Sequence, residues 1–194
     1  MSSTALRLAV IIASTRAGRR GPMVTSWFAG QAGEYGGFDI DVIDLAEHPL
    51  PLDLTDDLDE GPAAVLAEVS GRLDKADAFV IVTPEYNHSF TAPLKNVIDW
   101  HKGEWKAKPI GFVAYGGTSG GLRAVEQLRL VFAELHAVTV RTSVAFPQVW
   151  EQFDSQGQPV DPAMFADHAK NMLSQLTWWG EALREARTTK PYFG

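Results

Sequence analysis

Three apolar runs in this chain are each followed directly by a polar loop rich in glycine, proline or arginine. The apolar runs span residues 8–13, 78–82 and 110–114, and the loops span residues 14–21, 83–88 and 116–121. In an open parallel α/β sheet, the loops at the carboxyl ends of the strands open onto one edge, where ligands bind. The pattern therefore predicts a parallel sheet with one binding site at that edge.

The three loops differ in the chemistry that they offer to a ligand. The first carries Arg16, Arg19 and Arg20, the second carries the aromatic Tyr86, and the third is mostly glycine. Arginine suits a phosphate group, and glycine lets the backbone approach a flat molecule closely. We therefore expect a flat ligand with a phosphate tail, and flavin mononucleotide (FMN) is the cofactor that fits this description.

Strand and helix patterns alternate five times along the chain. The predicted strands span residues 8–13, 38–45, 77–82, 110–114 and 138–144, and the predicted helices span residues 23–34, 62–75, 93–100, 121–136 and 162–187. Such alternation implies a parallel sheet covered by helices on both faces. We predict a flavodoxin-like, doubly wound α/β fold with five parallel strands, formed by residues 1–194 as a single domain.

Composition excludes several classes of function. The chain has no cysteine, which rules out disulfides, thiolate nucleophiles and cysteine-ligated metals. Its net charge of −7 argues against nucleic acid or an anionic membrane surface as a partner. No apolar stretch approaches the ~20 residues of a membrane span, and the amino terminus has no signal-peptide pattern. We expect a cytoplasmic protein.

The first loop matches neither the G-x-G-x-x-G dinucleotide fingerprint nor the P-loop. It offers instead the hydroxyls of Ser14 and Thr15, three guanidiniums and the free N–H groups of a helix start. That combination suits a phosphate monoester. The alternative is a surface turn with solvated arginines.

The second and third loops each allow a second interpretation. Tyr86 can lie against a planar ring or pack on the core, and His88 alone is weak support for catalysis. Residues 117–121 match the G-x-S-x-G nucleophile elbow, which predicts an esterase triad of Ser119, Asp154 or Asp161, and His168. That hypothesis leaves the arginines of the first loop unexplained and takes its histidine from a helix pattern.

Other features favour structural roles. The acidic segment 53–60 is expected to be a solvated loop, and the histidine spacing does not suit a metal, so none is predicted. The tryptophans at positions 100, 105, 178 and 179 are expected in the core or at a subunit contact. Aromatic residues are enriched at interfaces, which makes a dimer a fair expectation.

Three motifs together closely resemble the NADPH-dependent FMN reductase family, which includes quinone, azo-dye and chromate reductases. They are Ala-Ser-Thr-Arg-x-Gly-Arg from residue 13, Thr-Pro-Glu-Tyr-Asn-His-Ser from residue 83 with Leu94-Lys95-Asn96-x-x-Asp99-Trp100, and Tyr-Gly-Gly-x-x-Gly-Gly-x-Arg from residue 115. The resemblance extends from about residue 6 to the last helix, through the turn at 50–52 and the stretch 153–157.

The resemblance implies a role for each loop in holding FMN. The phosphate would be held by Ser14, Arg16, Gly21, Pro22, Met23 and Val24. One side of the isoalloxazine would be lined by Pro84, Glu85, Tyr86, Asn87 and His88. Its pyrimidine end would meet Gly116, Gly117, Thr118 and Ser119. Many family members carry glycine at the position of His88, which leaves open a contribution of this side chain to substrate choice.

The activity implied is hydride transfer from NAD(P)H through FMN to quinones or similar acceptors, such as free flavin, azo compounds or metal oxyanions. We expect a ping-pong mechanism, because donor and acceptor would share one flavin face. The flavin does the redox chemistry, so no catalytic side chain is named. The resemblance also implies a homodimer or homotetramer in which a neighbouring subunit helps to wall the pocket. The rival hypothesis is a non-enzymatic FMN electron carrier.

Overall fold

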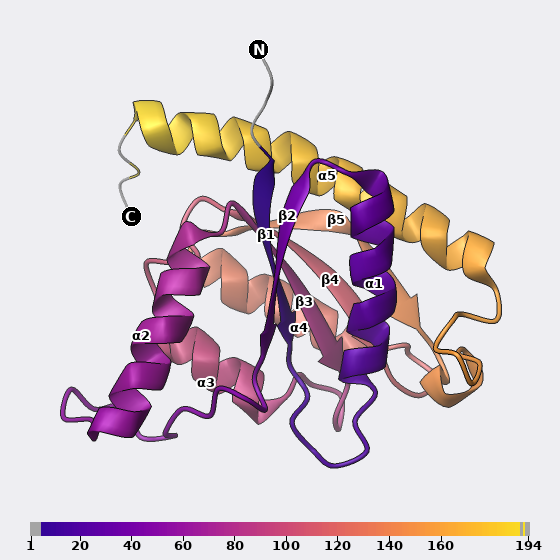
Figure 1. Cartoon of the computed structure of the whole chain (residues 1–194), viewed down its shortest axis with the longest axis horizontal. Coiled ribbons are helices and arrows are strands. Elements are labelled where there is room, and N and C mark those ends of the chain that lie inside the picture. The colour runs from indigo at the N-terminus through magenta and orange to yellow at the C-terminus, as the bar shows by residue number, and fades with distance from the viewer. Residues whose placement is uncertain (1–4, 191, 193–194) are drawn as a thin grey trace.

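The described part of the chain, residues 5–190 and 192, forms a sheet with the strand order β2-β1-β3-β4-β5 in the computed structural model (Figure 1). All neighbouring strands are parallel. The strands are β1 (Leu6–Ile12), β2 (Phe38–Asp44), β3 (Ala78–Pro84), β4 (Pro109–Tyr115) and β5 (Val138–Phe146). The helices are α1 (Gly21–Tyr35), α2 (Glu60–Lys75), α3 (Ala92–Trp100), α4 (Leu122–Glu134) and α5 (Pro162–Thr189), with a short 3-10 helix η1 (Val149–Glu151).

This topology confirms the flavodoxin-like, doubly wound fold predicted from the sequence. The predicted strands and helices are all present, and their ends differ from the prediction by a few residues. The η1 helix was not predicted. None of the helices in the described part of the chain is both long and apolar enough to cross a membrane.

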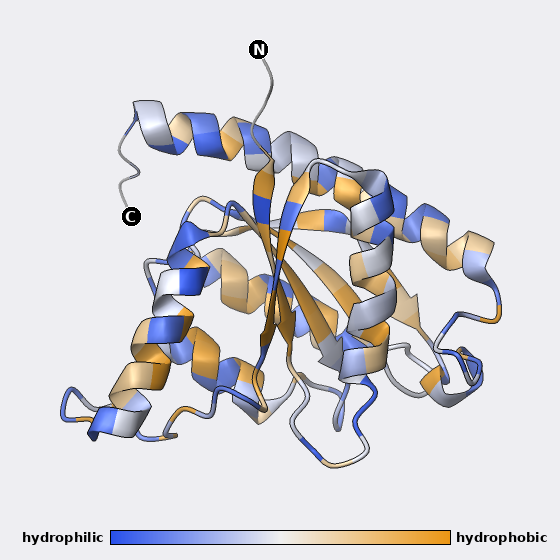
Figure 2. Ribbon diagram, in the orientation of Figure 1, coloured by the Kyte–Doolittle hydropathy of each residue, from blue (hydrophilic) through white to orange (hydrophobic). Residues whose placement is uncertain are grey.

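The central strands are apolar because both faces of the sheet are covered. Every residue of β3 and β4 is buried, whereas the edge strand β2 exposes Asp39 and Val42. Figure 2 shows this pattern, with apolar strands inside and polar residues on the outer faces of the helices. Apolar residues are paired across neighbouring strands. Val10 of β1, for example, lies opposite Val42 of β2 and Val80 of β3.

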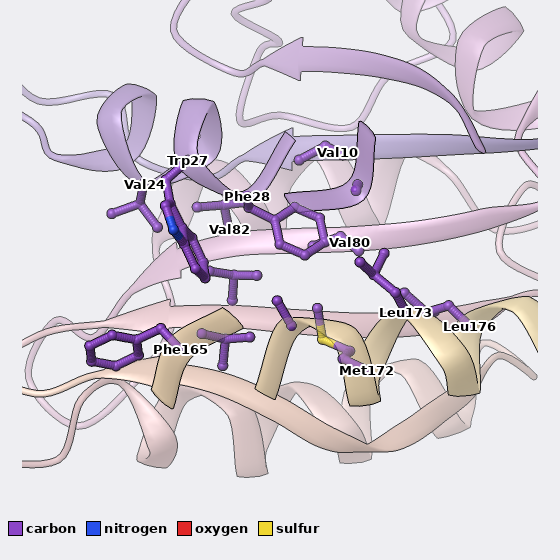
Figure 3. Packing of buried hydrophobic residues seen from close by; sticks show 14 of the residues in the cluster. Val10, Val24, Trp27, Phe28, Val80, Val82, Phe165, Met172, Leu173 and Leu176 are labelled. Carbon is purple, nitrogen blue, oxygen red and sulfur yellow. The ribbon is translucent and has the colours of Figure 1, made fainter. Parts of the chain in front are cut away.

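Helices α1 and α5 cover one face of the sheet. Trp27 of α1 meets Phe146 of β5 edge to face, with ring centroids 5.1 Å apart, and Phe146 lies 4.3 Å from Phe165 of α5. Figure 3 shows this layer, with Phe28, Met172, Leu173 and Leu176 packed on the valines of β1 and β3. Such aromatic pairs add about 0.5–1.5 kcal/mol each beyond the burial of their area.

Helices α2, α3 and α4 cover the opposite face. Trp105 is fully buried there, with its ring 4.7 Å from Phe79 of β3 and 5.3 Å from Phe132 of α4. Its indole N–H donates to the carbonyl of His101, which satisfies the only polar atom of the side chain. The burial of Trp105 confirms one of the tryptophan predictions.

The two adjacent tryptophans of α5 differ in their burial. Trp179 packs against the core, whereas Trp178 is 63% exposed, so that its place at a subunit contact stays a prediction. Leu122, the first residue of α4, is 46% exposed, whereas Val125 and Leu128 of the same helix are buried. The aspartates of the 53–60 segment are exposed, as predicted.

Candidate functional site

The carboxyl ends of the inner strands bring three loops to one edge of the sheet. We call them loop 1 (residues 13–20), loop 2 (residues 85–91) and loop 3 (residues 116–121). They lie at the lower edge of the molecule in Figure 1. Backbone hydrogen bonds continue the sheet into the loops, from Ala13 N–H to the Val82 carbonyl, from Glu85 N–H to Tyr115, and from Gly116 N–H to Phe146.

Loop 1 is held by one long-range hydrogen bond and by the close approach of the start of α1. The Tyr115 hydroxyl donates to Ser14 Oγ over 3.0 Å, and both groups are buried. Burial raises the pKa of Tyr115 to about 12, so the phenol stays protonated and keeps donating. A Cβ on Gly21 would lie only 2.4 Å from Ser14 Oγ, so only glycine allows α1 to begin this close to loop 1. Ser14 therefore forms part of the floor of the site.

Arg19 is hydrogen-bonded within the protein, and its side chain is therefore not free for a ligand. Its guanidinium donates to the Ser14 carbonyl over 2.8 Å and to both carboxylate oxygens of Asp44 at the end of β2. Burial raises the pKa of Asp44, but the hydrogen bonds from Arg19 and from the Ala46 N–H outweigh it and leave the pKa below its usual value. The expectation of three arginines available to a phosphate is therefore wrong for Arg19, because Asp44 already neutralises it.

Arg16 and Arg20 remain exposed on loop 1. The guanidinium of Arg16 lies over the ring of Tyr86, 5.0 Å from its centroid, which joins loops 1 and 2 by a cation–π contact. Helix α1 begins beside these arginines with no side-chain cap and no acidic residue in its first turn. The positive end of the helix dipole therefore adjoins Arg20, the residue before α1, and the exposed Arg16 lies on the same loop, which is favourable for an anion.

The remaining loop 1 candidates lie in the first turn of α1. Pro22 is exposed and Met23 is partly exposed, whereas Val24 is fully buried in the core. The N–H of Val24 donates to the Arg20 carbonyl. The side chain of Val24 therefore faces the protein interior and not the site.

Loop 2 makes a two-residue turn of type I′ geometry. Tyr86 and Ser89 exchange backbone hydrogen bonds of 2.9 and 3.0 Å, and the central residues Asn87 and His88 have φ of 51° and 66°. Such turns favour glycine at the second central position, so His88 is held in a conformation that is strained for its side chain. Gln127 of α4 holds the turn, since its amide donates to the His88 carbonyl over 2.7 Å.

Glu85 joins loop 2 to loop 3. Its side chain is 7% exposed, and its carboxylate accepts from Ser119 Oγ over 2.6 Å, from the Arg123 N–H over 3.1 Å and from the Arg123 guanidinium over 3.0 Å. Burial raises the pKa of Glu85, but these hydrogen bonds overcome that effect and lower the pKa below its usual value. Glu85 is therefore a charged acceptor that positions loop 3 and is poorly suited to be an acid.

Loop 3 requires glycine at its end. Gly121 has φ of 91°, and a Cβ there would lie 2.7 Å from the Tyr115 nitrogen. Gly116 and Gly117 have no side chain above the loop, while Thr118 is exposed. The loop is fixed on its far side by residues after β5, because Gln148 and Val149 donate to the carbonyls of Gly117 and Gly116. The backbone of loop 3 is thus held in place, and Gly116 and Gly117 are partly exposed.

The structure does not assemble the esterase triad. The Ser119 hydroxyl donates to Glu85, and no hydrogen bond joins it to a histidine among the described residues. His168 is exposed on α5, Asp161 caps that helix through the Met164 N–H, and Asp154 accepts from the N–H groups of Gln156 and Gln158. Ser119 also lacks the positive φ that a strained elbow would show. The structure thus gives the esterase hypothesis no support.

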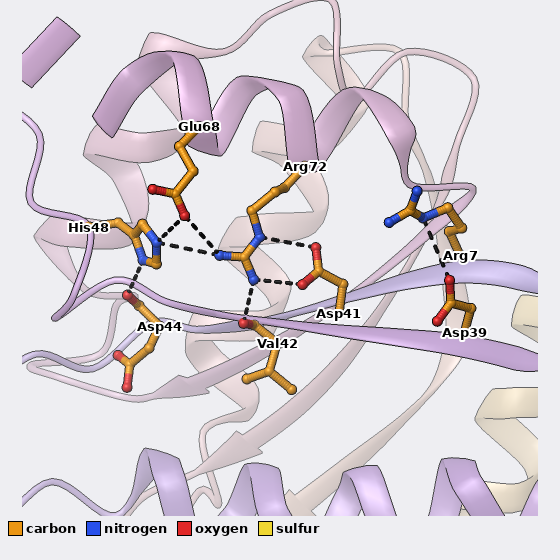
Figure 4. A network of polar contacts seen from close by, with 8 residues as sticks. All are labelled: Arg7, Asp39, Asp41, Val42, Asp44, His48, Glu68 and Arg72. Carbon is orange, nitrogen blue, oxygen red and sulfur yellow. Dashed lines mark hydrogen bonds and ion pairs between the residues drawn. The ribbon is translucent and has the colours of Figure 1, made fainter. Parts of the chain in front are cut away.

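A polar network supports the connection between β2 and α2 next to loop 1. Figure 4 shows Arg72 bound to Asp41 and to the Val42 carbonyl, while His48 contacts the Asp44 carbonyl and Glu68. The Asp44 carboxylate points away from this network, toward Arg19. Where the end of β2 meets loop 1, hydrogen bonds therefore hold both the backbone carbonyl and the side chain of Asp44.

A cavity of about 400 Å³ adjoins loop 1 on the side of α3. It is lined by Thr15, Leu45, Ala46, His48, Pro49, Leu50, Leu52, Ala92, Pro93, Asn96 and Val97. Neither Tyr86 nor loop 3 lines this cavity. Across the described residues, no group of three acidic or histidine side chains is placed to hold a metal ion.

Several residues of the site were not predicted. Asp44 ends β2 and has no distinguishing motif of its own. Tyr115 ends β4 and opens the third motif, but the motif did not signal its contact with Ser14. Arg123 lies within the third motif, which signalled its position but not its partner Glu85. No sequence signal pointed to Gln127 or to the residues after β5, because their role depends on contacts across the sheet edge.

Residues 6–151 match the model of a family described as NADPH-dependent FMN reductase. The chain is 31% identical over 146 residues to a probable NADPH:quinone oxidoreductase 2 of Oryza sativa subsp. japonica, covering 72% of this chain and 71% of the relative. It is 31% identical over 143 residues to an FMN-dependent NADPH-azoreductase of Staphylococcus saprophyticus, covering 70% and 74%. An NADPH:quinone oxidoreductase of Arabidopsis thaliana is 36% identical over 133 residues, covering 64% and 66%.

Among solved structures, the chain is similar to a flavoenzyme NAD(P)H:(acceptor) oxidoreductase, FerB, of Paracoccus denitrificans. The TM-score is 0.75 at 22% sequence identity, and the match covers 92% of this chain and 98% of that chain. This likeness confirms the fold.

Proposed function

The chain belongs to the NADPH-dependent FMN reductase family and is an FMN-dependent enzyme with NAD(P)H as co-substrate, and we propose that it passes electrons to quinones or azo compounds at the edge formed by loops 1 to 3. The observation that carries the proposal is the meeting of three loops, one cationic, one aromatic and one of bare glycine backbone. Residues 1–194 act as one FMN-binding reductase domain in this proposal. The names of the relatives, quinone oxidoreductases and azoreductases, support this class of acceptor.

The residues of loop 1 and α1 suit the phosphate of FMN. The start of α1 has no side-chain cap and no acidic residue, and Arg16 and Arg20 stand exposed beside it. We assign the phosphate to Arg16 and to the first turn formed by Gly21, Pro22, Met23 and Val24, with Ser14 as the floor. Val24 only completes this turn, because its N–H donates to the Arg20 carbonyl and its side chain is buried in the core.

Loops 2 and 3 suit the ring system. Pro84 to His88 line one side in this proposal, and Gly116 to Ser119 offer backbone groups at the pyrimidine end. Glu85 keeps the two loops at a fixed separation through its hydrogen bonds to Ser119 and Arg123. Bound FMN supplies the hydride chemistry. The protein supplies position and dipoles, and we assign no catalytic acid or base.

Donor and acceptor use the same site in turn in this mechanism, because the loops approach a ligand from one edge of the sheet and leave one face of it open. NAD(P)H binds first and leaves as the oxidised nucleotide, and the acceptor then enters. The enzyme acts as a homodimer or homotetramer in this proposal. The cytoplasmic location expected from the sequence stays a prediction.

Steady-state kinetics test this function. We expect FMN-loaded protein to oxidise NAD(P)H when a quinone such as menadione is present, with parallel double-reciprocal plots at several quinone concentrations. An electron carrier would show negligible NAD(P)H oxidation without a partner reductase, which would contradict the proposal. Intersecting plots together with a ternary complex would contradict the shared site but leave the activity itself in place.

A further inference from the structure

An exposed tryptophan stands at the rim of the site. Trp150, the central residue of η1, is 56% exposed. Its ring atom Cη2 lies 3.9 Å from the position of a Cβ built on Gly117. The indole therefore lies against the bare glycine backbone of loop 3, whereas the other highly exposed tryptophan, Trp178, is on α5.

The backbone before Trp150 is held by hydrogen bonds to loop 3, although Trp150 itself is exposed. Gln148 precedes η1 with φ of 48° and ψ of 53°, a left-handed conformation that is uncommon for a residue other than glycine. Gln148 and Val149 donate to the carbonyls of Gly117 and Gly116 over 2.9 and 3.1 Å. Strained backbone of this kind concentrates at functional sites, where the surrounding structure determines it.

One further contact anchors η1, and another holds the indole itself. The side chain of Val149 is buried and anchors η1 in the core. The indole N–H of Trp150 donates to Glu151 Oε1 over 3.2 Å. Among the described residues, Trp150 makes no ring–ring contact with another aromatic side chain, so its flat face is not used within the chain.

We propose that Trp150 is a specificity-determining residue that receives the aromatic ring of the electron acceptor. This inference rests on the proposed function, because it takes the space above loop 3 as the place where the acceptor reaches the cofactor. Gly117 places no side chain in that space, and the indole borders the space with a flat apolar surface. Aromatic rings in offset or edge-to-face contact attract one another beyond their area burial. The acceptor class that benefits is therefore planar and aromatic, such as naphthoquinones and azoarenes.

A small inorganic acceptor provides the contrast. Ferricyanide has no aromatic ring, so its reduction gains nothing from the indole. We expect Trp150→Ala to raise the KM for menadione about 3- to 12-fold, from the loss of one aromatic contact. The KM for ferricyanide, kcat and the Kd for FMN should stay within about 2-fold of the wild type. Trp150→Phe should restore most of the menadione KM, and Trp178→Ala, a control at a similarly exposed tryptophan, should leave it unchanged.

A binding measurement without turnover completes the test. In the proton–nitrogen NMR spectrum of the FMN-bound protein, the indole signal of Trp150 is the one of six that is absent in Trp150→Phe. We expect 1,4-naphthoquinone to shift this signal and not that of Trp178. A wild type that turns over neither acceptor would contradict the proposed function, whereas the naphthoquinone shift would still report on Trp150.

Three results would overturn the inference itself. One is an unchanged menadione KM in Trp150→Ala together with an unshifted indole signal. Another is an equal rise of the KM for both acceptors or a weakened FMN affinity, which would place Trp150 in the cofactor site. The last is a changed oligomeric state by light scattering, which would make Trp150 a subunit contact.

Discussion

Arg19 and Asp44 form a two-point pair that ties loop 1 to the end of β2. Arg19 Nη2 donates to Asp44 Oδ2 over 2.7 Å, and Nη1 donates to the other carboxylate oxygen and to the Ser14 carbonyl. The side chains are 19% and 12% exposed, so solvent screens the pair only in part. Arg19 thus shapes the loop that we propose to hold the phosphate, although it is not itself assigned to the ligand.

Removal of this pair should lower stability. We expect Arg19→Ala to reduce the free energy of unfolding by about 1.5–3 kcal/mol, because the charged Asp44 loses two hydrogen bonds. Arg20→Ala, an exposed neighbour without a comparable partner in the structure, should change it by less than about 0.5 kcal/mol. Urea denaturation of both variants measures the difference. Equal free energies of unfolding for the two variants would show that the Arg19–Asp44 pair does not stabilise the fold.

Arg16 should bind FMN through the phosphate. Loss of a charge-assisted hydrogen bond costs about 1.5–3 kcal/mol, so Arg16→Ala should weaken FMN binding about 10- to 150-fold. Riboflavin affinity should hardly change, because riboflavin has no phosphate. Quenching of flavin fluorescence gives both affinities. An Arg16→Ala variant with wild-type FMN affinity would mean that loop 1 is a surface turn.

Glu85 should affect the ring site and not the phosphate site. Glu85→Gln keeps the size of the side chain but removes the charge that accepts from Ser119 and Arg123. We expect FMN and riboflavin affinities to fall together, about 5- to 30-fold. Glu126→Gln, an exposed carboxylate on α4, is the control. A loss confined to FMN would refute this assignment.

Ser119→Ala should keep most NAD(P)H-dependent reductase activity. The hydroxyl donates one hydrogen bond to Glu85, and Arg123 still supplies two donors to that carboxylate. Turnover with menadione at saturating FMN measures the effect. Abolished turnover in a variant that still binds FMN would return Ser119 to a catalytic role.

Lys108 should make stability depend on alkaline pH. Its ammonium caps the end of α2 through the carbonyls of Leu73 and Asp74, and burial lowers its pKa from 10.5 to about 8. The unfolded chain therefore binds more protons than the folded chain between about pH 8 and 10.5, and stability rises with pH in that window.

Comparison with Lys108→Met isolates this contribution. The difference in unfolding free energy, wild type minus variant, should increase by about 3 kcal/mol from pH 8 to pH 10.5. Other groups, including Tyr115, titrate alike in both proteins and cancel. Denaturant titrations across this range provide the measurement, and a difference that is constant with pH would refute the lowered pKa.

The sequence predicted the sheet because buried parallel strands are continuous apolar runs, as residues 78–82 and 110–114 are. It predicted which loops meet, since the carboxyl ends of parallel strands share an edge. It did not predict the side-chain contacts that hold these loops in place. Tyr115 and Ser14 are 101 residues apart, and Arg19 and Asp44 are 25 apart, so neither pair has a local signal. The η1 turn was missed because it depends on the left-handed Gln148 and on hydrogen bonds to loop 3.

The comparison of FMN with riboflavin in an equilibrium titration of the wild-type apoprotein tests the central claim most directly. The account predicts about one flavin per chain and FMN affinity at least about 10-fold above that of riboflavin, because only FMN carries a phosphate for Arg16 and the start of α1. Equal affinity for the two flavins would contradict the phosphate site, and binding of neither would contradict the flavin site altogether.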